Sequence, residues 1–261
     1  MKYLMSLLRK IMPQRYRARV RYILGTIFYF GLRFKCPCCG GHFRKFLLYE
    51  YPERHERLGV EPYSNAACPR CSSVERHRLL ELYLKNETNF FTDNLKVLHI
   101  APEPFFQQKF KTLPNLDYLS ADISSPLAMT QMDITDILLP DSQFDCIICY
   151  HVLEHIPDDG KAISELFRVL KLGGWAILQS PIDFNRDKTF EDPSVTSPQE
   201  QERVFGQKGH VRIYGSDYKD RLEKAGFVVK VDNYVQQLGD ALIRKYALRK
   251  REDIYICSKP E

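Results

Sequence analysis

Two closely spaced cysteine pairs carry the clearest chemical signal in the chain. Cys36 and Cys39 lie in the sequence CPCCG, and Cys68 and Cys71 follow in CPRC after a spacer of 28 residues. Four thiolates that converge from two such pairs form a tetrahedral shell, the geometry of structural Zn²⁺ sites, with no coordination position left open for catalysis. The pattern therefore predicts a structural Zn²⁺ site. We expect Cys38 to stay outside it, although this thiol could compete with Cys36.

A second group of residues could bind a nucleoside. The apolar run Val97–Ile100 indicates a buried strand, and Asp122 ends a second such run about twenty residues later. In nucleotide-binding βαβ units the turn after the first strand faces the ligand, and an acid at the end of the second strand binds the ribose hydroxyls. We therefore expect the turn Ala101–Pro104 and Asp122 to line one site.

Four side chains could accept a proton from a nucleophile: His151, Glu154, His155 and His210. Histidine is attractive because it titrates near neutral pH. We name His210 as the candidate general base and His155 as the second catalytic candidate. Two alternatives stay open, namely a solvated loop histidine at 210, and a role for Glu154 and His155 in shaping the cofactor floor.

His210 lies in a segment of loop character at residues 183–215, which we expect to act as an active-site lid. Arg212 in the same segment could pair with an anionic group of the substrate through its planar guanidinium.

Strand and helix patterns alternate from residue 95 onward, which is typical of a parallel sheet with helices on both faces. We expect Asp158 or Asp159 to begin the second helix and Gly173–Gly174 to end it. A further helix at 72–91 is expected to begin with a capping box of Ser72 and Glu75. The expected strands are Lys96–Ile100, Asp117–Asp122, a short one near Met129–Asp133, Phe144–Tyr150, Gly174–Ser180, Phe227–Tyr234 and Asp253–Ser258, and the helices lie near Phe105–Lys111, Gly160–Leu170 and Ser216–Ala225.

The run FDCIICYHVLEHIPDD (144–159), the double glycine that follows and the segment MDITDILLPDSQFD resemble class I S-adenosylmethionine-dependent methyltransferases of the type 11-like family. The resemblance implies an α/β fold with a doubly wound, seven-stranded Rossmann-like methyltransferase sheet. It also implies S-adenosyl-L-methionine as cofactor, with Asp122 at the ribose, Asp133 and Ile134 around the adenine, and His151 near the methionine end. The implied cofactor contacts are Ala101, Glu103, Asp122, Ile123, Asp133, Ile134 and His151.

The first motif departs from the family pattern. Ala101, Glu103 and Phe105 stand where the family has three glycines, and His99 replaces its acid. The sequence VLHIAPEP, with ERHRLL at 75–80, the zinc knuckles and FGQKGHVRIYG, resembles a narrower bacterial methyltransferase subgroup over roughly residues 36–235. We expect Glu103 to meet the ammonium or ribose of the cofactor. A different adenosyl ligand and a degenerate site stay open.

Charge is distributed unevenly along the 261 residues. The net charge is +5, yet residues 1–49 hold eleven Lys or Arg and no acid, which leaves the remainder at −6. Such a basic arm suggests an anionic partner. We divide the chain into a basic amphipathic N-terminal helical arm (1–35), a small zinc ribbon (36–71) and a class I methyltransferase domain (72–261). The arm is expected either to lie on an anionic membrane or to pack on the protein itself.

Cysteine use favours a reducing compartment, and the apolar run Tyr22–Leu32 is too short to cross a bilayer. We expect a cytoplasmic protein, with peripheral attachment at the inner membrane face as an open alternative. Three functions are compatible with the sequence. They are methylation of a small-molecule or glycan acceptor near the membrane, methylation of RNA through the zinc ribbon and basic arm, and a non-catalytic zinc-ribbon binding protein. The methyl acceptor and the oligomeric state are not predicted.

Overall fold

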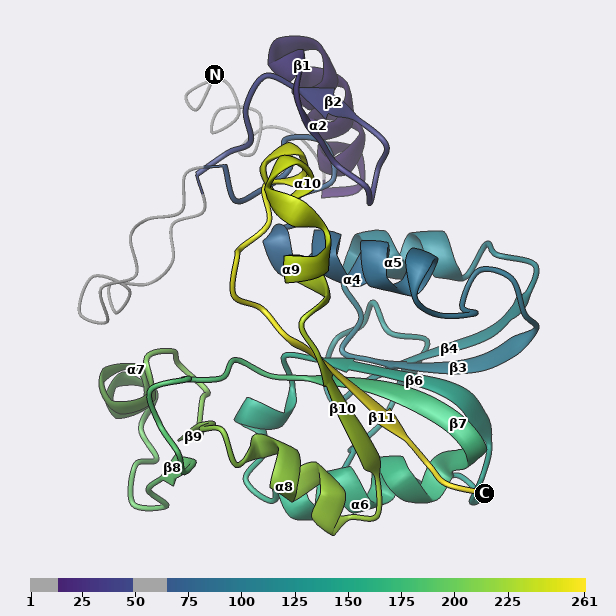
Figure 1. The fold of residues 1–261 in the computed structure, drawn as a ribbon, viewed down its shortest axis with the longest axis vertical. Coiled ribbons are helices and arrows are strands. Elements are labelled where there is room, and N and C mark those ends of the chain that lie inside the picture. The colour runs from purple at the N-terminus through teal and green to yellow at the C-terminus, as the bar shows by residue number, and fades with distance from the viewer. Residues whose placement is uncertain (1–13, 49–64) are drawn as a thin grey trace. The chain divides into compact units, whose positions relative to one another are not determined.

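The computed structural model describes residues 14–48 and 65–261, so the first thirteen residues of the predicted arm and the middle of the cysteine spacer lie outside the described residues. Contacts between Cα atoms group the chain into two compact units, which are described separately (Figure 1). Within the described residues, the first unit takes 14–48, 65–87 and 235–252, and the second takes 88–234 and 253–261.

The second unit contains the seven-stranded sheet that the sequence predicts. The strands lie in the order β10-β11-β7-β6-β3-β4-β5, and β11 pairs antiparallel with both β10 and β7, whereas the other pairs are parallel. The direction of the chain across the sheet reverses between β3 and β6, which makes this pair a topological switch point. The strands are β3 (Leu95–Ile100), β4 (Leu116–Asp122), β5 (Thr130–Gln131), β6 (Phe144–Tyr150), β7 (Leu170–Gln179), β10 (Val228–Asp232) and β11 (Ile254–Ser258).

Helices cover both faces of this sheet, which confirms the doubly wound fold. Helices α6 (Asp159–Val169) and α8 (Tyr218–Lys224) lie on one face, and α5 (Pro104–Phe110) lies on the other (Figure 1). On the α5 face, the rings of Phe106 and Phe110 pack against His99 of β3. On the opposite face, α6 and α8 share one core with the central strands, and its members from the two helices are Ala162, Ile163, Leu166, Val169, Tyr218 and Leu222.

The start of α6 was predicted correctly, and its end was not. Asp158 is the N-cap, and its side chain accepts a hydrogen bond of 2.9 Å from the Lys161 amide. The helix ends at Val169, and Gly173 and Gly174 lie inside β7. A Cβ atom on Gly174 would lie 2.9 Å from the Lys171 carbonyl oxygen, so the close approach of backbone segments, rather than a helix stop, requires this glycine.

The segment at residues 183–215 is more regular than the predicted loop. It contains β8 (Phe190–Glu191), α7 (Pro198–Phe205) and β9 (Arg212–Ile213), and β8 pairs antiparallel with β9. Ser197 caps α7 by accepting a hydrogen bond of 3.3 Å from the Glu200 amide. Some of the residues that suggested a loop therefore form an ordinary helix N-terminus, with Ser197 as the N-cap and Pro198 in the first turn.

The first unit combines helices with a small antiparallel pair of strands. Its elements are α2 (Gln14–Tyr29), β1 (Phe30–Lys35), β2 (His42–Phe43), α4 (Glu75–Asn86) and α10 (Gly239–Tyr246), while the short helix α9 (Tyr234–Gln237) lies at the boundary between the units. The predicted capping box of α4 is wrong. Val74 is its N-cap, and the Val74 amide donates to Nδ1 of His77 at 3.2 Å. Ser72 does not cap the helix because it lies in the left-handed turn before it, with φ of 65°.

Arg78 of α4 explains why residues 235–252 group with the cysteine segment. Its side chain is fully buried and donates to the carbonyl oxygens of Ala66, Ser73, Tyr246 and Ala247 at 2.6 to 2.9 Å. A buried guanidinium that has these acceptors satisfies most of its donors. The division into residues 1–35, 36–71 and 72–261 stays a prediction.

Candidate functional site

The carboxyl ends of three neighbouring strands meet at one edge of the sheet in the second unit. Ile100 of β3 pairs with Ala121 of β4 and with Cys149 of β6. The Ala101 amide continues the ladder by donating to the Ala121 carbonyl at 2.7 Å. The turns that follow β3, β4 and β6 are therefore neighbours, as expected for a ligand site at a switch point.

Two of these turns contain non-glycine residues in the left-handed region. Ala101 has a φ of 47° after β3, and His151 has a φ of 58° after β6. Residues other than glycine adopt this conformation at a cost, and such strain gathers at functional sites. The turn therefore keeps a backbone conformation that glycine favours, although alanine replaces the first glycine of the family motif.

The two predicted acids also lie at this edge. Asp122 ends β4, and one of its carboxylate oxygens accepts hydrogen bonds from the amides of Ser124 and Ser125 at 2.8 and 2.7 Å. Asp133 follows β5, and one of its oxygens accepts from the amide and the hydroxyl of Thr135, both at 2.8 Å. These two hydrogen bonds lower the pKa of Asp133, so it is ionised at neutral pH. Each carboxylate thus shapes its own turn with one oxygen, Oδ1.

The two predicted isoleucines differ in exposure. Ile123 is 58% exposed beside Asp122, whereas Ile134 is 4% exposed and belongs to the core. An exposed apolar side chain next to a strand-end acid can cover one face of a bound base. Ile134 could contact a bound base only from the side of the hydrophobic core.

Glu103 is the N-cap of α5 and turns back toward β3. Its carboxylate lies 3.5 Å from Nε2 of His99, whose Nδ1 lies 2.9 Å from the Tyr118 hydroxyl. His99 is fully buried, and the Glu103 side chain is 18% exposed. A glutamate four residues further along the chain therefore brings a carboxylate to the place where His99 has replaced the family's acid.

Glu154 lies beneath the turn after β6. Its carboxylate is buried, accepts a hydrogen bond of 3.0 Å from the Ser180 hydroxyl and lies 3.2 Å from Nδ1 of His151. Burial opposes its ionisation, but the hydrogen bond from His151 and the charges of His151 and His155 outweigh burial and lower the pKa of Glu154 to about 2. Glu154 thus positions His151.

The two catalytic candidates lie together although 55 residues separate them in the sequence. The rings of His155 and His210 pack edge to face with centroids 4.6 Å apart. Nδ1 of His155 lies 3.0 Å from the Gly209 carbonyl oxygen. Both rings are partly exposed, and the segment that carries His210 is held by the Val211 amide, which donates to the Glu154 carbonyl at 3.0 Å.

The expectation that Arg212 receives an anionic substrate is wrong. Its side chain is buried and donates to the carbonyl oxygens of Leu153, Ile156 and Pro157, and to the carboxylate of Glu191. Arg212 therefore fastens β9 to the turn after β6. The sequence placed Arg212 in a loop, where its guanidinium could meet a ligand. In the structure, its N–H groups instead donate to backbone carbonyl oxygens.

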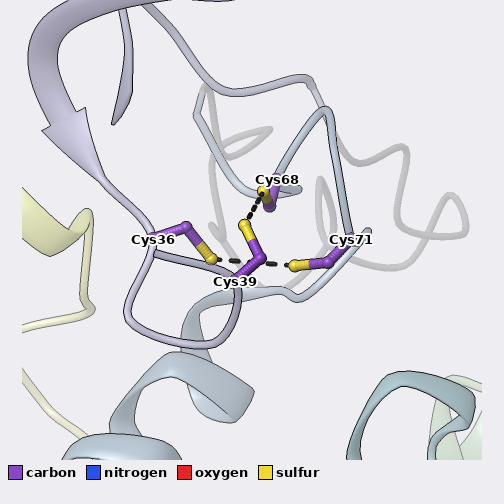
Figure 2. A group of neighbouring side chains, drawn as sticks. All are labelled: Cys36, Cys39, Cys68 and Cys71. Carbon is purple, nitrogen blue, oxygen red and sulfur yellow. Dashed lines mark hydrogen bonds between the residues drawn. The ribbon is translucent and has the colours of Figure 1, made fainter. Parts of the chain in front are cut away.

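The four predicted metal ligands converge in the first unit (Figure 2). The sulfur atoms of Cys36, Cys39, Cys68 and Cys71 all lie within 4.8 Å of one another. The Cys36–Cys71 and Cys39–Cys68 sulfur pairs are each 3.7 Å apart. A regular tetrahedron with Zn–S bonds of about 2.3 Å has edges of about 3.8 Å. The donor set therefore fits a Zn²⁺ ion.

The two cysteine turns have the same backbone pattern. The amide four residues after the first cysteine donates to its carbonyl, from Gly40 to Cys36 at 2.8 Å and from Ser72 to Cys68 at 2.9 Å. Gly40 and Ser72 both have positive φ, 68° and 65°. This repetition places the two pairs symmetrically around one centre.

Cys38 and Ser73 surround the cluster. The Cys38 sulfur points to the His77 carbonyl oxygen at 3.6 Å, and Cys38 is absent from the group of four converging cysteines. The Ser73 hydroxyl, fully buried, lies 3.2 Å from the sulfurs of both Cys36 and Cys71. Ser73 could not be identified from the sequence, because a serine two residues after a cysteine is common.

Comparison with known proteins adds a family match to this geometry. Residues 102–178 match the family described as a methyltransferase domain, which confirms the prediction of such a domain. A protein of Mycolicibacterium smegmatis named as a probable S-adenosylmethionine-dependent methyltransferase is 35% identical over 49 residues, 19% of each chain. The match thus spans about a fifth of that curated relative's length.

Solved structures resemble this chain in part, at low sequence identity. A SAM-dependent methyltransferase from Archaeoglobus fulgidus is 18% identical, with a TM-score of 0.46 over 69% of this chain and 93% of that one. The [4+2]-cyclase SpnF is 14% identical, with a TM-score of 0.49 over 93% of this chain and 96% of that one.

Proposed function

We propose that the second unit transfers a methyl group from S-adenosyl-L-methionine to an acceptor. The observation that carries this proposal is the edge of the sheet where the strained turn at Ala101 lies between the strained turn at His151 and the strand-end acid Asp122. An acidic side chain there suits the ribose hydroxyls of an adenosyl group. The family match over residues 102–178 supports the same chemistry.

The chain's own residues would bind the cofactor, orient the acceptor and remove a proton from it. S-adenosylmethionine, when bound, supplies an electrophilic methyl group. Asp122 would hold the ribose and Asp133 the adenine, while Ala101 and His151 would line the remainder of the cofactor site. A base of the chain would take up the proton of the acceptor's nucleophilic atom, and His210 and His155 are the candidates. Orientation supplies most of the rate.

Glu103→Ala tests the turn after β3. We expect the Kd for S-adenosylmethionine to rise roughly tenfold, because a charge-assisted contact contributes about 1.5–3 kcal/mol. Isothermal titration measures it, with S-adenosylhomocysteine in parallel and Glu223→Ala, an exposed exchange on α8, as control. If the wild type binds neither ligand, the proposed function is wrong and the non-catalytic alternative is favoured. If the wild type binds and Glu103→Ala binds equally well, only the role of Glu103 is wrong.

The cysteine cluster is proposed to hold Zn²⁺ for structure. Four sulfur donors would fill a tetrahedral shell, so this ion would stabilise the first unit without taking part in the transfer. The presence of the ion and the assignment as a zinc ribbon rest on the donor geometry described above.

For the acceptor, we propose a small molecule or a glycan presented near an anionic membrane surface. Residues 14–35 contain six Lys or Arg and no acid. They also expose apolar side chains, and the strongly exposed ones are Tyr22, Ile23, Ile27, Phe28, Phe30 and Leu32 at 48% to 80%. Apolar side chains beside basic charge suit an interfacial helix. No helix within residues 14–48 and 65–261 is long and apolar enough to span a membrane.

Replacing Ile23 and Ile27 together by aspartate is expected to weaken vesicle binding roughly hundredfold, because two apolar side chains contribute about 3 kcal/mol and new negative charge is repelled. Flotation with vesicles of phosphatidylserine and phosphatidylcholine measures the bound fraction. Leu138→Asp, an exposed exchange in the second unit, is the matched control.

Flotation that is equal for the wild type and the double variant would contradict the membrane proposal. RNA methylation is the second candidate because the same basic segment could bind phosphates. A salt-sensitive shift of RNA mobility, together with no flotation, would favour it.

A further inference from the structure

We propose that Glu154, His155 and His210 form a second metal site, which binds a divalent transition-metal ion. One carboxylate oxygen and one ring nitrogen from each histidine lie within 4.8 Å of one another. Two imidazoles and a carboxylate are a ligand set for Zn²⁺, Co²⁺ or Fe²⁺. The site is distinct from the four-cysteine cluster, which lies in the other unit.

His155 is oriented as metal-bound histidines usually are. Its Nδ1 lies 3.0 Å from the Gly209 carbonyl oxygen, which can only accept a hydrogen bond. Nδ1 therefore donates to this carbonyl oxygen, and Nε2 is the ring nitrogen left to face a ligand. Gly209 is needed for this approach: its φ is 85°, and a Cβ atom there would lie 3.3 Å from Nδ1 of His155.

Glu154 is a buried carboxylate whose described ion-pair partner is a histidine, His151. Its described contacts are the Ser180 hydroxyl and the Nδ1 atom of His151, and it forms no ion pair with a Lys or Arg of residues 14–48 or 65–261. A buried charge is costly unless it is paired or coordinates a metal. Each carboxylate oxygen has more than one lone pair, so the contacts with Ser180 and His151 leave acceptor capacity.

The backbone brings the two halves of the site together. Glu154 and His155 lie in the short helix η1 (Leu153–His155), directly after the strained His151, and His210 comes from the segment between α7 and β9. The Val211 amide donates to the Glu154 carbonyl at 3.0 Å, and Arg212 ties the same segment to Leu153. A bound metal ion would add a further link between η1 and the segment that carries His210.

Three protein ligands leave at least one coordination position open. An oxygen ligand could take this position, and metal binding would make a hydroxyl there more acidic. Under the proposed function, which this last step requires, the metal would lower the pKa of the acceptor hydroxyl so that its proton passes to solvent water, and the two histidines would serve as ligands rather than as bases.

The test titrates Co²⁺ into full-length protein whose cysteine cluster already holds Zn²⁺. We expect visible d–d absorption without thiolate-to-cobalt charge transfer, since the site contains no sulfur. His210→Ala should weaken Co²⁺ binding at least about hundredfold, because loss of an outer-shell partner alone costs about 10–100-fold. His42→Ala, an exposed histidine in the first unit, is the control and should leave binding unchanged.

Two results would overturn the proposal. One is a wild type that shows no d–d bands, or bands only with thiolate charge transfer, since the ion would then occupy the cysteines. The other is unchanged Co²⁺ affinity in His210→Ala. Because Glu154 is buried, Glu154→Gln serves as the second variant only after circular dichroism and thermal melting match the wild type. Neither readout depends on methyl transfer, so the proposal is judged independently of the proposed function.

Discussion

Replacing Cys39 by serine is expected to abolish metal binding at the cysteine cluster and to loosen the first unit. Four sulfurs surround the centre, with two 3.7 Å pairs at the spacing of a tetrahedral Zn²⁺ shell. The free energy of binding structural Zn²⁺ is about 10–16 kcal/mol in small zinc domains, and it appears as folding free energy. Substitution with Co²⁺ measures the loss directly through the thiolate charge-transfer band, and amide hydrogen exchange should accelerate in residues 30–48 and 65–74.

The matched control is Cys38→Ser, one residue away. Its sulfur points to the His77 carbonyl and lies outside the four converging cysteines, so this variant should keep the charge-transfer band. The second unit serves as an internal reference, because its amides should exchange at the wild-type rate in both variants. A Cys39→Ser protein that retains the full band, or a Cys38→Ser protein that loses it, would refute this assignment of ligands.

The stability of the proposed metal site should depend on the surrounding backbone as well as on the four thiolates. Gly40 and Ser72 hold the two turns in the same left-handed conformation, and the Ser73 hydroxyl lies between two sulfurs. Arg78 then holds Ser73 in place by donating a hydrogen bond to the Ser73 carbonyl oxygen. The cluster is thus supported by hydrogen bonds that reach as far as Ala247, and these bonds explain why the first unit gathers segments from both ends of the chain.

Much of the sheet could be predicted because its signals are local. Buried parallel strands are nearly continuous apolar runs, and FDCIICY is such a run, which ends at Tyr150. The same local information predicted a helix cap at Asp158 or Asp159, and Asp158 is the cap in the structure. The cysteines were identifiable because their spacing is set by a single turn of backbone, which is a short-range property.

The predictions that were wrong depended on contacts between distant segments. Gly173–Gly174 resembled a helix stop, but a Cβ atom at 174 would lie 3.1 Å from the carbonyl oxygen of Asp145 on β6. Arg212 was expected to pair with an anionic group of the substrate, yet its partners are carbonyl oxygens more than fifty residues away. Helix α10 lacked a recognised pattern because its place in the first unit depends on Arg78, 168 residues from Tyr246. No local pattern encodes such partners.

The predicted site residues differ in the same way: strand order predicts that some of them are neighbours, whereas others meet only through tertiary packing. The turn at Ala101 and the acid at Asp122 are neighbours because β3 and β4 pair in register, which strand order alone implies. The proximity of His155 and His210 could not be predicted, since it follows from the packing of residues 209–211 on η1. A sequence can therefore indicate which residues end strands, whereas tertiary packing decides which loop residues meet them.

The second large effect is expected from Asp122. Asp122→Ala should raise the Kd for S-adenosylmethionine roughly 10–150-fold, because a hydrogen bond to a charged group contributes about 1.5–3 kcal/mol. Asp122→Asn separates two roles of this side chain. Its amide oxygen can still accept from Ser124 and Ser125 and hold the turn, while the charge that favours the ribose hydroxyls is lost. We therefore expect Asn to weaken binding less than Ala, yet by at least about tenfold.

Asp117→Ala is the control, since it removes an exposed aspartate from the opposite end of the same strand. Isothermal titration with S-adenosylmethionine and S-adenosylhomocysteine gives the affinities, and thermal melting reports any loss of the turn. Weakened binding in Ala alone, with Asn equal to wild type, would mean that Asp122 acts only by shaping the loop. Wild-type affinity in both variants would place the adenosyl group elsewhere, because no other side chain at the end of β4 carries a charge.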